Sequence, residues 1–143
     1  MLGRRMKYSD AFEHANQHLS GKVCVILNAD MFLGEGVDAV LSKASDLFAI
    51  TPTALSLTRH ESRICNHREA NIFKDEANNS YCECAFMKRG YAGSHDSFWF
   101  QSPISQSVVD QTLQIQSRWG AEHKVINALL SSNYRVLNPS RSV

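Results

Sequence analysis

The chain has 143 residues, about the length of one domain, and its 43% hydrophobic and 20% charged residues are ordinary values for a globular protein. A formal net charge of +1 gives no electrostatic reason to expect nucleic acid or an anionic membrane as a partner. No apolar run approaches the roughly 20 residues that span a bilayer, so no transmembrane segment is expected. The lack of a visible targeting segment favours the cytoplasm and leaves the secretory lumen open as a location.

One helix and one strand are predicted at the start of the chain. Ser9 is expected to cap a helix over residues 10–19, with Gly21 as its terminator. The apolar run 22–27 is rich in β-branched residues and predicts a buried, central strand. Cys24 lies inside this run and is expected to be a small buried hydrophobe.

Helices and strands continue to alternate along the rest of the chain. Apolar residues recur with helical spacing over 37–48, and a strand is expected over 54–58. From 59 to 93 the periodicity disappears, which predicts a long polar loop. Four later elements are expected, in the order strand, helix, helix and strand: 97–100, 103–113, 121–132 (with Val125, Ile126, Leu129 and Leu130 inward) and 135–137. This alternation favours an α/β domain with a layered sheet.

Asn28 and Asp30 come directly after the first strand. In open α/β sheets, ligands bind beyond the carboxyl ends of the strands. Side chains two residues apart on an extended segment point the same way, so these two could converge on one ligand. Their oxygen atoms suit a hard divalent ion such as Mn²⁺ or Mg²⁺. The alternative is that Asp30 only begins a turn and caps the segment after it.

An ordered set of motifs extends this interpretation. Its members are Ile26-Leu27-Asn28-Ala29-Asp30, Ala54-Leu55-Ser56-Leu57-Thr58-Arg59, Gly93-Ser94-His95-Asp96-Ser97-Phe98-Trp99-Phe100, Trp119-Gly120-Ala121-Glu122-His123 and Tyr134-Arg135-Val136-Leu137-Asn138-Pro139-Ser140. In this order they resemble a family of GT-A glycosyltransferase domains found in viruses, bacteria and eukaryotes. The resemblance covers roughly residues 4 to 143 and implies a GT-A-like, nucleotide-diphospho-sugar transferase fold with a layered sheet and flanking helices.

The resemblance also implies roles for four residues. Asn28 and Asp30 match the acidic motif that binds the divalent metal, Mn²⁺ or Mg²⁺, with an asparagine in place of the first acid. Asp96 matches an acidic residue that faces the hydroxyls of the donor sugar or of the acceptor. Glu122 matches the position where inverting members place a catalytic base, which would take the proton of the attacking hydroxyl. The alternative is that Glu122 only stabilises a helix N-terminus.

The implied reaction transfers a sugar from a nucleotide-sugar donor to a glycan or other hydroxyl acceptor, and the metal neutralises the departing diphosphate. In this fold a first strand–helix–strand unit grips the nucleotide base, and no room for it exists before Tyr8. The chain also ends at Val143, where the resemblance places a further strand with a histidine ligand. We therefore expect residues 1–143 to form a single but partial glycosyltransferase-like domain.

A second candidate metal site lies in the irregular segment, which carries Cys65, His67, Cys82 and Cys84. The three cysteines could be free thiols, Cys65 could form a disulfide with Cys82 or Cys84, or all four residues could bind zinc. The single residue between Cys82 and Cys84 is unusual for a zinc site. For His95 a hydrogen-bonded structural role is favoured. Trp99 and Trp119 are expected in the core, and Trp119 is the better candidate of the two for stacking against a sugar.

Two other functional hypotheses compete with a glycosyltransferase. A sugar nucleotidyltransferase would need a glycine-rich basic segment for triphosphate, and Gly3-Arg4-Arg5 is too short for that. A degenerate, non-catalytic carbohydrate-binding or interaction domain of the same fold is favoured by Asn28 and by the missing N-terminal unit. Fold alone does not decide between these hypotheses, because function depends on the site.

Overall fold

The computed structural model describes residues 4–28, 31, 33, 37–57, 95–114, 116, 118 and 120–138. In chain order the elements are α1 (Tyr8–His18), β1 (Val23–Leu27), α2 (Val37–Ile50), β2 (Thr53–Leu57), β3 (Ser97–Gln101), α4 (Gln106–Gln111), α5 (Ala121–Ser131) and β4 (Arg135–Leu137). Each predicted helix and strand is confirmed, with its ends shifted by a few residues. The predicted loop over 59–93 lies outside the described residues.

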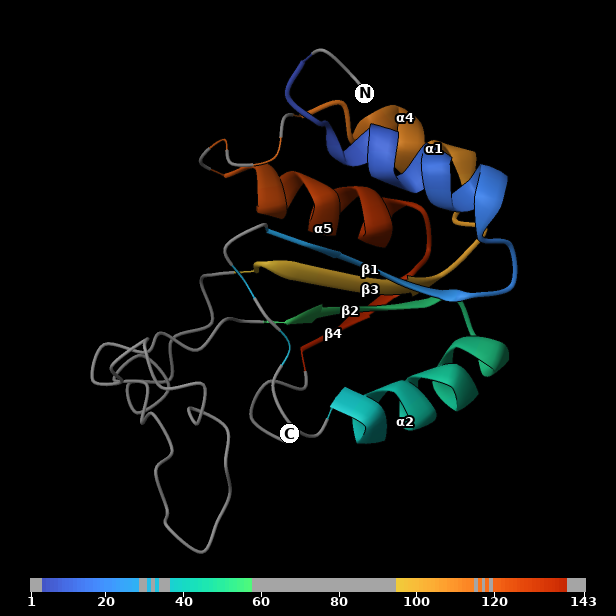
Figure 1. Cartoon of the computed structure of the whole chain (residues 1–143). Coiled ribbons are helices and arrows are strands. Elements are labelled where there is room, and N and C mark those ends of the chain that lie inside the picture. Colours follow the sequence, from blue (N-terminus) through green and yellow to red (C-terminus); the bar gives the residue numbers. More distant parts are fainter. Residues whose placement is uncertain are drawn as a thin grey trace, which may run out of the picture.

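The four described strands form one mixed sheet in the order β1-β3-β2-β4. β3 pairs antiparallel with both β1 and β2, so that Trp99 lies opposite Val25 on one side and Leu55 on the other. β4 pairs parallel with β2. Among these strands β1 lies at an edge, so the prediction that it is central was wrong. Because of this pairing, the carboxyl ends of β1, β2 and β4 lie beside the first residue of β3, along one edge of the sheet that is formed by strand ends (Figure 1).

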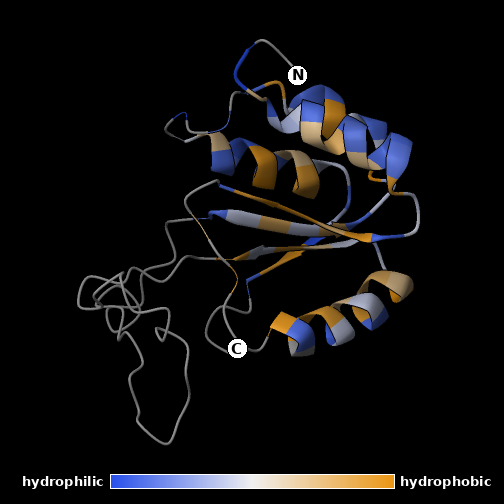
Figure 2. Cartoon of the chain, in the orientation of Figure 1, coloured by the Kyte–Doolittle hydropathy of each residue, from blue (hydrophilic) through white to orange (hydrophobic). Residues whose placement is uncertain are grey.

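Helices cover both faces of the sheet, which confirms the layered α/β prediction (Figure 1). One apolar core lies between the sheet and α1, α4 and α5, and it includes Phe12, Phe100 and Val125. The second core lies between the sheet and α2, around Leu55 and Trp99. In Figure 2 β1 is coloured as hydrophobic, β3 and β2 are mostly pale, and the helices carry both hydrophobic and hydrophilic residues. Trp99 is 1% exposed, as expected for a core residue, whereas Trp119 lies outside the described residues.

The start of α1 differs from the prediction. Ser9 is buried within the helix, and Lys7 is the N-cap residue. The Lys7 backbone N–H donates to Asp10 Oδ2 over 2.7 Å, and Asp10 also forms an ion pair with Arg4. The first turn is therefore stabilised by the side chain of Asp10, whereas the sequence predicted that the side chain of Ser9 would do this. This earlier start brings Tyr8 onto the buried face of the helix.

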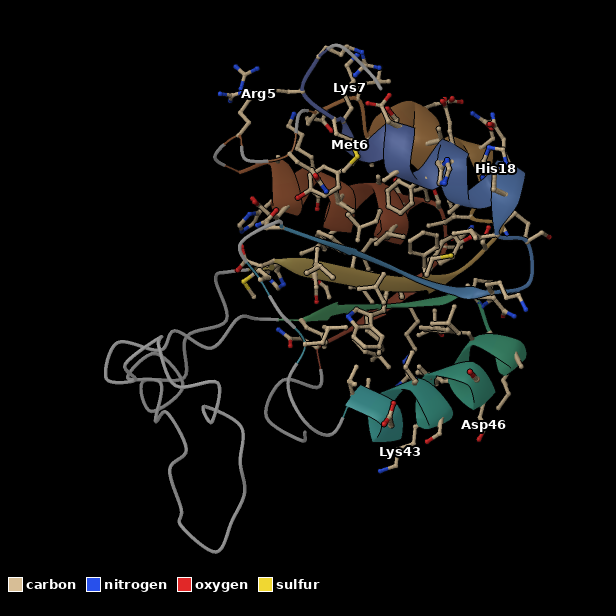
Figure 3. The ribbon with its side chains drawn as sticks, viewed as in Figure 1. Arg5, Met6, Lys7, His18, Lys43 and Asp46 are labelled. Atoms are coloured by element: carbon tan, nitrogen blue, oxygen red, sulfur yellow. The ribbon has the colours of Figure 1, made fainter. Side chains whose placement is uncertain are left out.

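The other helices bury the faces that their spacing predicts, with one exception. On α5, Val125 and Leu129 are buried, but Leu130 is 52% exposed and does not point inward. On α2, Lys43 and Asp46 point away from the sheet (Figure 3). In the part of the chain that the structure describes, no helix is both long enough and apolar enough to cross a membrane.

Candidate active site

Three of the four residues predicted to form the site belong to elements that meet at one edge of the sheet. Asn28 comes directly after the last residue of β1, Asp96 precedes β3, and Glu122 lies in the first turn of α5. Because β3 runs antiparallel to β1, the end of one strand lies beside the start of the other. The first turns of α1 and α5 lie over the same edge (Figure 1). Asp30 lies outside the described residues.

Asn28 and Asp96 are in direct contact. The Asn28 side-chain amide donates from Nδ2 to Asp96 Oδ1 over 3.1 Å. Asp96 is only 7% exposed, and its backbone N–H donates to the Leu57 carbonyl oxygen over 3.1 Å. Asp96 is therefore connected to the ends of both strands that flank β3. Donation through Nδ2 leaves the amide oxygen of Asn28, the atom that a metal would bind, outside this hydrogen bond.

The segments that carry Asp96 and Glu122 are in contact, since the rings of the adjacent residues His95 and His123 have centroids 5.9 Å apart. Burial raises the pKa of the Tyr8 hydroxyl, and the negative charges of Glu122 and Asp96 raise it further. Tyr8 is 2% exposed and packs edge-on against Phe98, with 5.7 Å between the ring centroids. The segments of Asp96 and Glu122 thus lie side by side, and both charges act on Tyr8 at the start of α1.

His95 is hydrogen-bonded, which confirms the structural role favoured for it. Its Nδ1 lies 2.8 Å from the hydroxyl of Ser56, a residue of β2 that is 1% exposed. Burial lowers the pKa of His95, a backbone hydrogen bond with Ser56 opposes this, and the charge of His123 lowers the pKa further. The two rings are perpendicular, with 5.9 Å between centroids. A histidine with a lowered pKa is neutral at neutral pH, so His95 adds no positive charge to the site.

Asp96 and Glu122 also act on His95, because both charges raise its pKa in partial opposition to burial. The same two carboxylates therefore influence Tyr8 and His95, two side chains that approach from different elements. Tyr8 was not predicted as part of this site. The signal was present in the spacing of Tyr8, Phe12 and Ala15, which places all three on one helical face.

The glycine that precedes α5 helps to position Glu122. Gly120 is the N-cap residue and has φ 77° and ψ 4°, a left-handed conformation that glycine adopts without steric cost. The chain turns there and enters the helix at Ala121, so Glu122 lies in the first turn. This places the Glu122 side chain near the partial positive charge of the helix N-terminus.

A groove of about 690 Å³ lies elsewhere, between α1 and β1. Its lining includes Ala11, Cys24 and Phe100, and it does not include Asn28, Asp96 or Glu122. This groove is therefore not the predicted cleft. A cleft shared by Asp30, Asp96 and Glu122 stays a prediction, since Asp30 is outside the described residues.

The described residues contain no group of three or more histidine, cysteine, aspartate or glutamate side chains that could hold a metal ion. Of the two predicted metal ligands, Asn28 offers an amide oxygen, the donor type that suits Mn²⁺ or Mg²⁺, and Asp30 lies outside the described residues. Asp30 would be the additional ligand. The second candidate metal site, at Cys65, His67, Cys82 and Cys84, lies outside the described residues.

No family model, no curated protein and no solved structure matches the chain.

The case for a function therefore depends on the residues at this edge of the sheet. They comprise an amide bonded to a buried carboxylate, a second carboxylate at a helix start, a neutral histidine and a buried tyrosine. Carboxylates in such a setting can accept hydrogen bonds from hydroxyl groups, take up a proton or contribute to a divalent-metal site.

Proposed function

We propose that this chain is part of a metal-dependent glycosyltransferase of the GT-A type, which transfers a sugar from a nucleotide-sugar donor to a hydroxyl acceptor. The observation that carries the proposal is that the motifs of Asp96 and Glu122 lie side by side, because the rings of the adjacent residues His95 and His123 have centroids 5.9 Å apart. The order of the motifs along the sequence supports it as well.

Each residue has a role in this proposal. Glu122, in the first turn of α5, takes the proton from the acceptor hydroxyl as the hydroxyl oxygen attacks the anomeric carbon. Asp96 accepts a hydrogen bond from a sugar hydroxyl, while the Asn28 amide holds its carboxylate in place. Asp30 and the Asn28 amide oxygen would hold Mn²⁺ or Mg²⁺, which when bound supplies positive charge for the departing diphosphate.

The experiment has a binding step and a transfer step. Nucleoside diphosphates should stabilise the chain against heat in the presence of Mn²⁺ and less in its absence, because a ligand of the folded state shifts unfolding. With a matching nucleotide-sugar donor and acceptor, a full-length version that includes the base-gripping unit should release nucleoside diphosphate. Glu122→Gln should keep the binding and lose the transfer, since the amide cannot act as a base.

Glu13→Gln is the matched control, because it makes the same chemical change at an exposed residue of α1. It should leave both steps unchanged. Transfer by Glu122→Gln at the unmutated rate would show that the base assignment is wrong.

A degenerate carbohydrate-binding domain is the second candidate, and the Asn28–Asp96 hydrogen bond favours it. This bond occupies Asp96 with a neutral partner within the protein, and the position of Asn28 carries no charge of its own to attract a metal. In that case the chain would bind glycans without a nucleotide or a metal. Glycan binding that is insensitive to Mn²⁺, with no response to any nucleoside diphosphate, would select this second function.

A further inference from the structure

Two histidines lie side by side on the outside of α1, away from the candidate active site. His14 and His18 are four residues apart, and their ring centroids are separated by 4.7 Å with an angle of 51° between the ring planes. Both residues are exposed, and Figure 3 shows His18 in the last turn of the helix. Residues four apart are neighbours on a helix surface, so the backbone itself holds the two rings together.

This spacing suits metal chelation. A neutral imidazole is the commonest protein ligand for transition metals, and two histidines at positions i and i+4 of a helix can reach one zinc ion. The helix is already formed, because Phe12 and Ala15 on its other face are buried in the core. Little further ordering is therefore needed when a metal binds.

We propose that His14 and His18 form a two-point binding site for a metal ion that prefers imidazole, such as Cu²⁺, Ni²⁺ or Zn²⁺. These ions bind well to imidazole nitrogen, whereas Mg²⁺ and Mn²⁺ prefer oxygen ligands. This site is independent of the proposed glycosyltransferase and takes a different class of metal.

The neighbouring residues make this a site with two protein ligands. Both carboxylate oxygens of Asp10, one turn before His14, are already bound by Arg4. Within the described part of the chain no third histidine, cysteine, aspartate or glutamate completes a metal-binding group. Water or a group from another molecule would fill the remaining coordination positions, so the expected affinity is modest and strongly dependent on pH.

The test uses paramagnetic Ni²⁺ and the untagged chain, with ¹⁵N-resolved NMR as the readout. Ni²⁺ should broaden the backbone amide signals of α1, whereas Mg²⁺ should have no effect on them. The position of the broadening separates this site from any metal bound at Cys65, His67, Cys82 and Cys84.

Two variants complete the test. His18→Gln removes one ligand and should raise the Ni²⁺ concentration needed for the same broadening by roughly tenfold or more, since chelation is lost. The double variant His14→Gln with Gln17→His keeps composition and charge but makes the two histidines adjacent, so that they no longer face each other. It should behave like the single variant. An unchanged response in the double variant, or broadening of the wild-type chain that spares α1, would overturn the proposal.

Discussion

Asn28→Asp tests the electrostatics of the candidate site most directly. The substitution exchanges the amide that donates to Asp96 for a second carboxyl group, and the two groups would be about as close as the present 3.1 Å. Asp96 is 7% exposed, so water screens the new interaction poorly. We expect the variant to be less stable near neutral pH and to recover stability as the pH falls.

The magnitude depends on two competing costs. Two ionised groups at this distance would repel by about 5 kcal/mol at an effective dielectric constant of about 20. Keeping one carboxyl protonated near neutral pH costs about 4 kcal/mol, because the ordinary pKa of aspartate is about 3.9. The smaller cost sets the limit, so the pair shares a proton and the variant loses about 2–4 kcal/mol of unfolding free energy near neutral pH.

The sign of the pH dependence is fixed by the same reasoning. One carboxyl of the folded pair has a raised pKa, so the folded state binds more protons than the unfolded state does. Stability then decreases as pH rises, and the deficit should shrink by about 1.4 kcal/mol per pH unit down to about pH 5. Asn28→Ala is the control, because it removes the same hydrogen bond without adding a charge. Its deficit should change little over this range.

Urea denaturation monitored by circular dichroism measures these differences for the three proteins at each pH. Adding Mn²⁺ should restore stability to Asn28→Asp more than to Asn28→Ala, since a cation offsets the repulsion of two carboxylates. If Asn28→Asp matches the wild-type stability at every pH, the side chain does not face Asp96, and the electrostatics inferred for the site are wrong.

Three other substitutions test the supports of the site. Phe12→Ala removes a ring that is fully buried and lies 5.0 Å from the Phe100 ring centroid, and it should cost about 3–5 kcal/mol in urea denaturation; a loss below about 1 kcal/mol would contradict this packing. Gly120→Ala places a side chain on a residue with φ 77° and should lower the free energy of unfolding by about 1 kcal/mol, which is measured as a lower melting temperature. An unchanged melting temperature would mean that the turn is not left-handed. The hydrogen bond from Arg4 lowers the pKa of Asp10 from 3.8 to about 2, so its stabilisation is present above about pH 4 and is lost toward pH 2. Asp10→Ala should therefore lower stability near neutral pH by about 1 kcal/mol and less at about pH 2, as measured by circular dichroism; an equal loss at both would contradict the ionic origin.

The local elements could be predicted because their signals are local. The apolar run before Asn28 and the helical spacing after Gly120 each depend on a few neighbouring residues. The cap of α1 was mispredicted because Ser9 and Asp10 both suit a helix start, and only the folded packing of Tyr8 shows which register is used. Short patterns define a face without defining the exact first residue.

The order of the strands could not be obtained in the same way. Trp99 lies between Val25 and Leu55, which come from opposite sides of the sheet's central strand and are far from it in the sequence. Such pairing depends on which sheet buries the most apolar surface once the helices are packed, and no single window of sequence contains that information. The convergence of Asp96 with Glu122 was predictable only through the resemblance, because its geometric cause is this same long-range pairing.

The electrostatic arrangement at the sheet edge bears on whether the site is active or degenerate. Asp96 and Glu122 lie close enough to influence the same side chains, and carboxylates that share a half-buried site repel each other. Two dipoles offset that repulsion: the Asn28 amide at Asp96 and the N-terminus of α5 at Glu122. His95 lies beside them but has a lowered pKa, so it contributes no positive charge at neutral pH. Dipoles reduce the energetic cost of two negative charges without cancelling them, so a divalent cation would find a favourable potential here. If the two carboxylates share one site, their repulsion costs stability unless a cation or a ligand offsets it, so replacing one of them should not lower the stability of a domain that needs only its fold.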